Sequence, residues 1–390
     1  MVHRRQIKRL LFAVCLVLAA CEPWADTRDV VAHYPIPVRV PNNLPARVDE
    51  AALPLGNAPA DADAEQLEAL WWVNTYRAHA GLEALDQVAG LNASAAAHAT
   101  YLVDNPAAYN EGMSPHEQAE GLPGFLAVFH WQRMLAAGYS GEPFSEVIDF
   151  RASPAAAVTR WVETVYHRLP LLHPEARHVG YGRAQRGASR VDVLDIGAGD
   201  GTRWHIPGGA MWPPDGAQDV VLSWNGAETP RPPVPAGGFP SGPVISLTFG
   251  AGQAPMVAAH ALVNTQTGQL VAHTLLEPAN DDLMAFYGVV TLYANAPLAP
   301  GVRYQVRLSG TANGAAFERV SVFTTRNHAP CDLVAQNCGP GRACHRNYDG
   351  QPVCTWAGSG PAGAACATHM DCAAGTHCAA KFCTHYSVES

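Results

Sequence analysis

The sequence predicts a multidomain protein in which an α/β or α+β sandwich precedes a β-sandwich and a small disulfide-rich module. Three observations predict this fold class. Helical and strand-like patterns alternate within residues 63–205, and several short strand-like runs follow within residues 243–326. Most of the cysteines, eight of ten, fall within residues 327–390. A chain of 390 residues has room for two or three such domains, at roughly 100 to 200 residues each.

Residues 1–21 predict an export signal. MVHRRQIKRLLFAVCLVLAAC has a basic start, an apolar run from Leu10 to Ala20 and small residues before Cys21. The run is shorter than the roughly 20 residues that a membrane-spanning helix needs, so we expect cleavage. LAAC resembles the bacterial lipobox, in which the cysteine is lipidated; a bare signal peptide is the alternative. A lipidated Cys21 would anchor the exported chain to the periplasmic or extracellular face of a membrane.

Residues 22–62 predict a flexible tether. They are rich in Pro, Ala and Asn, with PIPVRVPNNLP at their centre, and show no sustained helical or strand period. The folded part of the chain is therefore expected to begin near Asp63.

The domain expected at residues 63–205 contains three helices. The first starts at Asp63 and stops at Gly81. One face of it carries four residues at spacings of three and four: Leu67, Leu70, Trp71 and Asn74. The second lies in LNASAAAHATYLVDN, and the third is expected to be capped by Ser153, with Pro154 in its first turn. The apolar stripe of the third helix comprises Val158, Trp161, Val162 and Val165.

Three short runs between these helices are expected to be strands, namely SEVIDF, HVGYG and VDVLDIG. The stretch VDVLDIGAGDGTRW also has the glycines of a methyltransferase-type nucleotide-binding turn. That turn needs a helix after the glycines, whereas WHIPGGAMWPPDG has two adjacent prolines and no helical period. We therefore expect a buried strand here and no nucleotide cofactor.

Residues 206–242 are rich in Pro and Gly and predict a linker. The strand-like runs that follow it are ISLTFG, MVAAHALVN, QLVAHTLL, VVTLYA, VRYQVRLSG and FERVSVFTT. Short strands at this spacing predict a β-sandwich at residues 243–326. PLAPGVRYQVRLSG and VSVFTT resemble Ig-like, fibronectin-like repeats of bacterial surface proteins, a resemblance that implies a scaffold and no particular ligand.

The cysteines of the tail (residues 327–390) predict a disulfide framework. They are even in number, lie close together in the sequence and belong to a chain that is expected to be exported. They are Cys331, Cys338, Cys344, Cys354, Cys366, Cys372, Cys378 and Cys383. A weak repeat, NCGPGRAC and DCAAGTHC, favours closure within each half of the tail. A zinc site is the alternative.

Five segments of the first domain occur together in a recognisable order: VNTYRAHAGLEAL, AAAHATYL, SPHEQ, GYSGEPFSEVI and RWVETVYHRLPLLHPEARHVGYG. They resemble the CAP superfamily of cysteine-rich secretory proteins, antigen 5 and plant pathogenesis-related proteins, and are most similar to its bacterial, SCP-type branch. The resemblance covers roughly residues 64–198. It implies an α-β-α sandwich with a cleft lined by histidines and acids, which binds a divalent metal in some members.

The resemblance assigns His116 in SPHEQ, Glu146 in SEVI and His167 in VYHR to this cleft. Glu163 is a further candidate for an acid of the cleft, but it lies two residues after Trp161, whereas eukaryotic relatives have this acid three residues after the tryptophan. Two neutral imidazoles and a carboxylate can bind Zn²⁺ or another divalent metal, or serve as general acid and base; the alternative is a structural role only. Nearby residues of suitable type expected on the surface without a site role are Glu117, His130, His173 and His178. Scaffold roles are expected for Asn74, Arg77 and Trp161.

These features favour a non-enzymatic surface lipoprotein that binds a small hydrophobic ligand, a divalent metal or another surface component. The alternative is a metal-assisted extracellular hydrolase of peptides or esters. Against the hydrolase, the sequence has no GxSxG or HExxH motif and no cysteine between Glu22 and Pro330. The formal net charge of −9 and the lack of a Lys/Arg cluster in the mature chain count against nucleic acid as a partner.

Overall fold

The computed structural model describes most of the chain beyond the expected tether. The described residues are 56–107, 113–150, 154–187, 189–326, 331–338, 342–346, 352–366, 371–379 and 381–386. The export signal, Cys21, most of the tether and Ser153 lie outside them. Within this described part, no helix combines the length and the apolar character needed to cross a membrane.

A four-stranded sheet forms the centre of the first domain. β4 (Ser189–Gly197) pairs antiparallel with β3 (His178–Arg186) on one side and β2 (Pro143–Asp149) on the other, and the short β1 (Asp86–Gln87) pairs parallel with β3. VDVLDIG is thus an inner strand, as predicted. The next element after its glycines is another strand, β5 (Ala210–Trp212), and not a nucleotide-binding helix.

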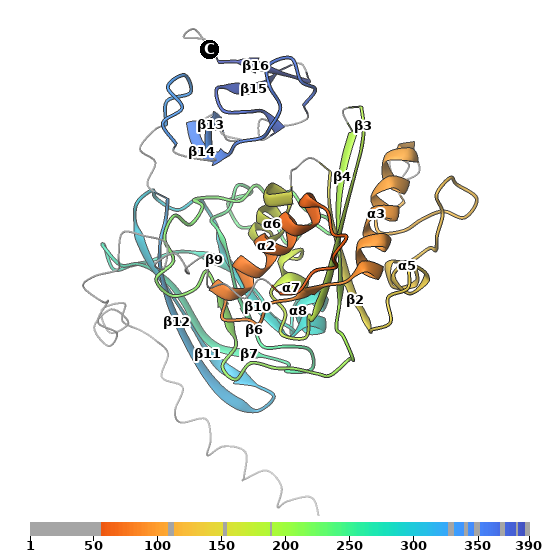
Figure 1. Cartoon of the computed structure of the whole chain (residues 1–390). Coiled ribbons are helices and arrows are strands. Elements are labelled where there is room, and N and C mark those ends of the chain that lie inside the picture. The colour runs from red at the N-terminus through yellow and green to blue at the C-terminus, as the bar shows by residue number, and fades with distance from the viewer. Residues whose placement is uncertain are drawn as a thin grey trace, which may run out of the picture.

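Helices cover both faces of this sheet (Figure 1). α2 (Ala64–His79), α6 (Pro154–Glu163) and α7 (Arg168–Leu171) lie on one face, and α3 (Ala89–Asp104) and α5 (His130–Ala136) lie on the other. The arrangement is an α-β-α sandwich.

Each face of the sheet contributes to a separate hydrophobic core. Val147 and Leu194 pack with α2 and α6, whereas the adjacent Ile148 and Val193 pack with α3. Successive residues of a strand point to opposite faces, so a strand buried on both sides is apolar at consecutive positions, which is what SEVIDF and VDVLDIG contain.

Helix α2 begins and ends where the sequence predicts. Asp63 and Gln66 form a capping box at its start, and Gly81 follows its end with φ of +73°. Its buried face differs from the predicted one. That face consists of Ala69, Leu70, Val73, Asn74 and Arg77, because α6 and β3 both pack against this side of the helix. Leu67, which the spacing places on one face with Leu70 and Asn74, is 46% exposed.

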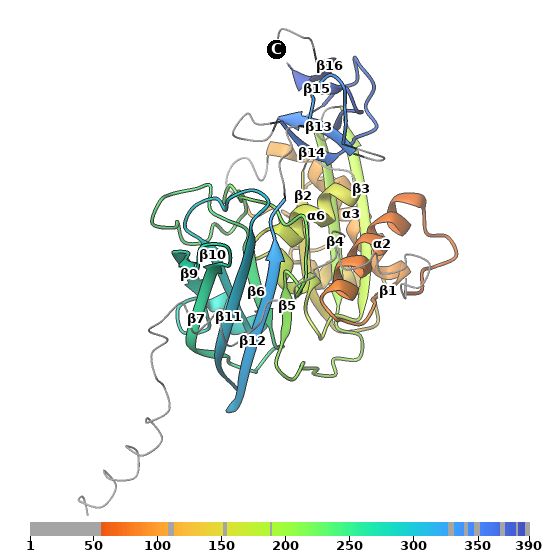
Figure 2. The same ribbon diagram turned by 90° about the vertical axis from the view of Figure 1, so that its left-hand side faces the viewer.

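The second domain is built from two four-stranded sheets (Figure 2), with strand orders β5-β6-β10-β9 and β12-β11-β7-β8. The bounds are β6 (Val244–Thr248), β7 (Met256–Asn264), β8 (Gln269–Leu270), β9 (His273–Leu276), β10 (Val289–Ala294), β11 (Arg303–Ala312) and β12 (Ala315–Thr324). Leu247 and Leu292 of one sheet share a core with Leu262 and Val306 of the other. The predicted strand-like runs form these strands, with QLVAHTLL divided between β8 and β9; the Ig-like assignment stays a prediction.

Residues 206–242 are folded against the second domain, which corrects the expectation of a linker. β5 pairs with β6, and the chain beyond β5 follows the outer edge of β12. The backbone bonds that join the two are Gly216 N to Val322 O (2.7 Å), Thr324 N to Ala217 O (2.8 Å) and Val220 N to Thr324 O (3.2 Å). A Pro-rich composition excludes a helix, but an edge segment needs only some of its N–H groups for pairing.

The two domains share a hydrophobic core. Val165 and Leu169 of the first domain pack with Trp224 and Tyr287 of the second. Between them, the buried side chain of Arg168 donates an Nη1 hydrogen bond to the Val244 carbonyl oxygen at 2.8 Å.

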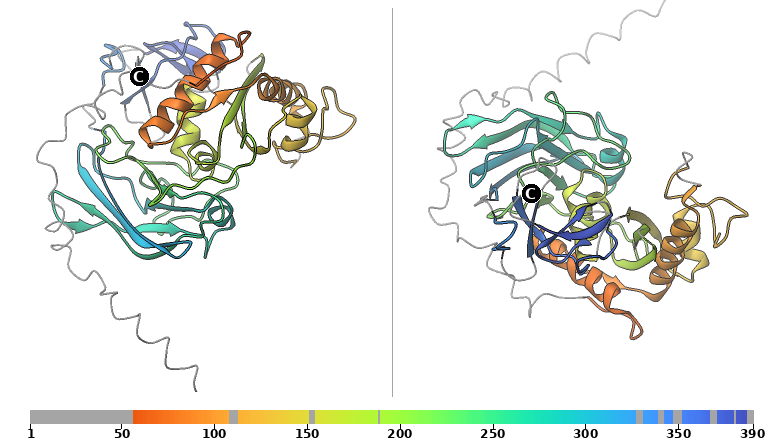
Figure 3. Two further views of the ribbon diagram at one scale, coloured as in Figure 1. Left: turned by 60° about the horizontal axis from the view of Figure 1, so that its bottom comes forward. Right: turned by 90° about the horizontal axis from the view of Figure 1, so that it is seen from above.

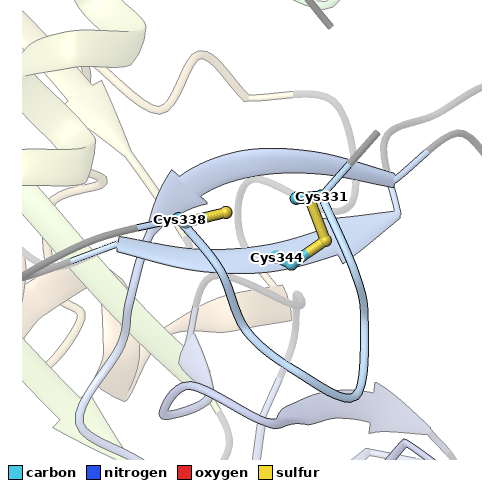
Figure 4. A group of neighbouring side chains, drawn as sticks. All are labelled: Cys331, Cys338 and Cys344. Atoms are coloured by element: carbon cyan, nitrogen blue, oxygen red, sulfur yellow. A yellow bond between two sulfur atoms is a disulfide. The ribbon is translucent and has the colours of Figure 1, made fainter. Parts of the chain in front are cut away.

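The tail forms two small hairpins held by disulfides. β13 (Arg342–Arg346) pairs with β14 (Pro352–Trp356), and β15 (Thr376–Ala379) pairs with β16 (Phe382–His385). The described disulfides are Cys331–Cys344, Cys366–Cys378 and Cys372–Cys383, and Cys338 is also disulfide-bonded. Figure 4 shows the first bond with Cys338 beside it. Closure within each half is confirmed for the three described bonds, and disulfide bonding excludes the zinc alternative for these cysteines and for Cys338. The Cys354 side chain lies outside the described part.

The tail rests on the first domain at the end where β3 joins β4 (Figures 1 and 3). Arg190 of β4 forms an ion pair with Asp371 at 2.8 Å, and the Asp371 side chain is only 3% exposed. The tail therefore has a defined docking position on the sandwich.

Candidate functional site

His116 and Glu146, from distant parts of the sequence, are in direct contact. Glu146 lies on β2 and its side chain is fully buried, whereas the His116 side chain, in the loop before α5, is 35% exposed. The distance between His116 Nδ1 and Glu146 Oε1 is 2.9 Å. Since an ionised carboxylate can only accept, His116 donates its Nδ1 proton, so the tautomer that fits this contact when the ring is uncharged has its lone pair on Nε2.

Arg133 of α5 binds the other oxygen of Glu146. Its Nη2 lies 2.7 Å from Oε2, and its Nη1 donates to the backbone oxygens of His116 (3.1 Å) and Val128 (2.9 Å). One guanidinium therefore holds both the carboxylate and the loop that carries the histidine.

The surroundings of Glu146 keep it ionised. Burial alone would raise its pKa, but the neighbouring imidazoles of His98 and His116 and the guanidinium of Arg133 outweigh burial and hold the pKa below its ordinary value. His116 is thus oriented by a permanently charged acceptor.

His98 of α3 lies behind this pair as a neutral side chain. Its Nε2 is 3.8 Å from Glu146 Oε1 and donates to the Pro115 carbonyl oxygen at 2.9 Å, while its Nδ1 accepts from Gln118 Nε2 at 2.9 Å. Burial lowers its pKa to about 4. Both ring nitrogens are therefore already used.

Asp195 is the cross-strand partner of Glu146, on β4. It is fully buried, and burial together with the charge of Glu146 raises its pKa well above the ordinary value. Two adjacent carboxyl groups therefore titrate as a coupled pair, in which Glu146 loses its proton before Asp195.

His167, the third predicted cleft residue, makes a different contact. Its Nδ1 lies 3.0 Å from Oε2 of Glu228, a fully buried side chain from the segment expected to be a linker. Glu228 also accepts from the backbone N–H groups of Val165 (2.8 Å) and Tyr166 (2.9 Å). The structure therefore uses His167 to join the two domains.

The donor set at His116 provides few free ligands for a divalent metal. Both oxygens of Glu146 and both nitrogens of His98 are occupied, Arg133 adds a positive charge, and among the nitrogen and oxygen ligand atoms of His98, His116 and Glu146 only His116 Nε2 is left open. Among the described residues, the groups of three or more His, Cys, Asp or Glu with donor atoms within 4.8 Å of one another consist of tail cysteines. His116, Glu146 and His167 do not form such a group, so the residues do not fit the three-ligand zinc site expected from the resemblance.

The remaining candidates belong to the scaffold or to the interface between the domains. Trp161 is buried in the core, Asn74 bonds Leu85, and Arg77 bonds four backbone oxygens, as expected for scaffold. Glu163 experiences the charges of Arg326, Arg160 and Arg168, and burial raises its pKa. It therefore belongs to the domain interface.

The three histidines and one glutamate expected on the surface differ in burial and in their contacts. His173 is fully buried, contrary to expectation, because Tyr287 of the second domain covers it and accepts its Nε2 hydrogen bond at 3.0 Å. His178 contacts the Tyr139 hydroxyl at 3.1 Å, and Glu117 is partly exposed in a bridge with Phe129. Burial lowers the pKa of His130, and the charges of Glu146, Arg133 and His116 act on it, so His130 lies near the site.

The functional residues that were not identified from the sequence are His98, Arg133, Asp195 and Glu228. The first three, however, are polar residues at positions where the pattern is otherwise apolar. His98 occupies an apolar-face position of its helix, between Ala95 and Leu102. Arg133 follows Trp131 in a short apolar helix, and Asp195 interrupts a buried strand. A charged or polar residue at a core position implies a partner. Glu228 could not be recognised in this way, because its segment has neither a helical nor a strand period that would define core positions.

Exposed apolar side chains lie on the segment that follows the His116 loop in the sequence. Leu126, Phe129, Trp131 and Leu135 are 37%, 43%, 46% and 48% exposed, and the Phe129 and Trp131 rings stack at 6.3 Å. Their segment is held against the His116 loop by Arg133 and by the bond from Gln118 N to Val128 O (3.0 Å).

Comparison with known proteins places residues 72–195 in a known family. They match the model of the CAP family, described as the cysteine-rich secretory protein family. No curated protein sequence matches the chain.

Proposed function

Because residues 72–195 form a CAP family domain, we propose that this chain is a non-enzymatic surface lipoprotein whose CAP domain binds a small amphiphilic molecule. The exposed apolar segment of residues 126–135 would take the apolar body of the ligand. His116 would take its polar end.

One observation supports this proposal above the others: four large apolar side chains are exposed on the short segment that Arg133 ties to His116. Exposed apolar patches with a polar rim mark binding surfaces in soluble proteins. His116 Nε2 can accept a hydrogen bond from a hydroxyl, or donate one once the ring is protonated. Such a surface needs no nucleophile and no metal.

The test is binding of a dansyl-labelled fatty acid, followed by fluorescence. Trp131→Ala and His116→Gln should each weaken binding about tenfold, since burying one large apolar group or keeping one hydrogen bond is worth about 1.5 kcal/mol. Phe286→Ala is the matched control, because Phe286 is 60% exposed on α8 (Asp282–Tyr287) in the other domain. If all three variants bound the fatty acid as tightly as the unmodified protein, the proposed surface would be rejected.

A hydrolase is the second candidate, favoured by the contact between His116 and Glu146. An imidazole oriented by a buried carboxylate is a suitable general base for activating water, with Nε2 accepting the proton while Glu146 stays ionised. Within the described residues, no hydroxyl bonds to the His116 ring, so water would be the nucleophile. The metal-assisted form would need ligands beyond those that the pair provides.

Assays with peptide and ester substrates separate the two candidates. For a hydrolase, His116→Gln should lower the rate by about 10² to 10⁴, and Glu146→Gln should have a similar effect. For a binding protein, the unmodified chain should show no turnover, and only ligand affinity should respond to His116→Gln.

Membrane anchoring through Cys21 is part of the proposal and lies outside the described residues. Replacing Cys21 by Ser should remove the lipid and release the exported protein into the soluble fraction. Complete retention of the Cys21→Ser protein with membranes would contradict the anchor.

A further inference from the structure

Two histidines of the second domain meet across the gap between its sheets. His260 lies on β7 of one sheet, and His273 starts β9 of the other. Their cross-strand partners are Leu308 and Ala294, both of which belong to the core between the sheets. Paired residues of an antiparallel sheet share a face, so both histidines project from the inner faces, at a place where His260 is exposed to solvent.

The two rings already direct nitrogen atoms at each other. His260 Nδ1 lies 2.8 Å from His273 Nε2. The other nitrogen of His273, Nδ1, lies 2.8 Å from the Val271 carbonyl oxygen, which can only accept, so Nδ1 carries the proton. The Nε2 lone pair of a neutral His273 therefore points toward His260. Metal-binding histidines commonly have their second nitrogen fixed by a carbonyl in this way.

The electrostatic surroundings favour the neutral form of His260. Burial and the neighbouring His273 lower the pKa of His260, and the nearby Glu277 acts in the opposite sense. Glu277 accepts a hydrogen bond from Val257 N at 3.0 Å. Neutral imidazole is the form that binds metal ions, and a carboxylate close by favours a cation.

We propose that His260 and His273 form a two-histidine site for a transition metal ion such as Zn²⁺, which links the two sheets of the second domain. The His260 proton would move from Nδ1 to Nε2, so that both facing nitrogens become ligands. Tetrahedral Zn²⁺ with bonds of about 2.0 Å needs a nitrogen–nitrogen separation of about 3.3 Å. The rings must therefore separate by about half an ångström, and water can complete the coordination because the site is open to solvent.

Calorimetric titration of the full chain with Zn²⁺ at pH 7.5 tests this site. His260→Gln and His273→Gln should each weaken binding at least tenfold. The control is His205→Gln, since His205 is exposed on the segment between the domains, and it should leave the affinity unchanged. None of these residues belongs to the His116 site, so the outcome is independent of the proposed ligand-binding function.

A second measurement uses stability. Zn²⁺ that joins the sheets should raise the melting temperature of the unmodified protein, by mass action on the folded state, and this rise should disappear in the His260→Gln/His273→Gln double variant. Equal Zn²⁺ affinity and an equal rise in the double variant would overturn the proposal and leave the pair as a hydrogen bond.

Discussion

Buried histidines in the first domain are held neutral by their hydrogen bonds. His98 and His173 each donate from Nε2 to a carbonyl oxygen and accept at Nδ1, from Gln118 and from Glu175 N respectively. A neutral ring satisfies both contacts, whereas a doubly protonated ring would direct a donor at another donor. Burial lowers the pKa of His98 to about 4 and that of His173 to about 3.

These shifts predict how stability depends on pH. Below the unfolded pKa of about 6.5, the unfolded chain binds protons that the folded chain excludes, so each histidine lowers the free energy of unfolding as pH falls toward its folded pKa. The slope from one histidine reaches about 1.4 kcal/mol per pH unit. Asp195, with its raised pKa, contributes in the opposite sense.

The measurement that isolates one histidine is urea unfolding of His173→Gln between pH 7.5 and pH 5. The slope of the free energy of unfolding against pH should decrease by up to about 1.4 kcal/mol per pH unit, which corresponds to one proton, relative to the unmodified protein. His205→Gln, at an exposed position, should keep the original slope. An unchanged slope in His173→Gln would mean that His173 binds protons equally in the folded and unfolded states, which contradicts a lowered pKa.

At the scale of the secondary-structure elements, Glu228 attaches the segment between the domains to the chain just before α7. Its carboxylate accepts from three backbone N–H groups, those of Val165, Tyr166 and His167, and contacts the His167 ring. Hydrogen bonds to a buried charge are stronger than neutral ones. The contact therefore fixes the end of α6 relative to α7 and to the second domain.

Replacing Glu228 by Gln should cost about 1 to 3 kcal/mol of stability, because the amide keeps the shape but loses the charge and one acceptor. Glu83→Gln is the control: the Glu83 side chain is 78% exposed and 3.8 Å from Arg177. Its effect should stay within about 0.5 kcal/mol. Denaturant unfolding measures both, and equal effects would show that the Glu228 contacts add nothing.

Elements were predictable from the sequence where a local period exists. Strands β2 to β4 and β6 to β12 and the helices at residues 64–79 and 89–104 follow their patterns, whereas the short strands β1 and β5 were not predicted. The His116–Glu146 contact could be expected only through the family resemblance, since the residues lie on separate elements. The His167–Glu228 contact could not, because a carboxylate in an aperiodic segment gives no indication of which backbone groups it will bind.

At the scale of the whole molecule, the first domain is incomplete without the second. Val165 and Leu169 are buried against Trp224 and Tyr287, and Arg168 is bonded to Val244 O. A fragment of residues 56–205 would expose these side chains to water and leave Arg168 without that acceptor.

We therefore expect the fragment of residues 56–205 to melt at a lower temperature than a fragment of residues 56–326. The second fragment should behave like the full chain, since it keeps the shared core. Calorimetry on all three checks this. Identical melting of the two fragments would show that the first domain folds independently.

The order of the bonded cysteines in the tail predicts the partner of Cys338. In its second half, the first cysteine bonds to the third and the second to the fourth, and in its first half Cys331 bonds to Cys344, also first to third. The same pattern predicts Cys338–Cys354. Peptide mapping of the unreduced protein by mass spectrometry should find this pair, and Cys338 joined to any other cysteine would break the repeat.

The segment that follows the edge of β12 has a consequence for copies of this protein that stand close together. An open strand edge is a template on which a neighbouring chain can add a strand, which leads to aggregation. Residues 216–220 already occupy the outer edge of β12 at Val322 and Thr324. On a crowded surface, such as the one proposed for this chain, adjacent molecules could collide along that part of the edge without finding free backbone groups to join.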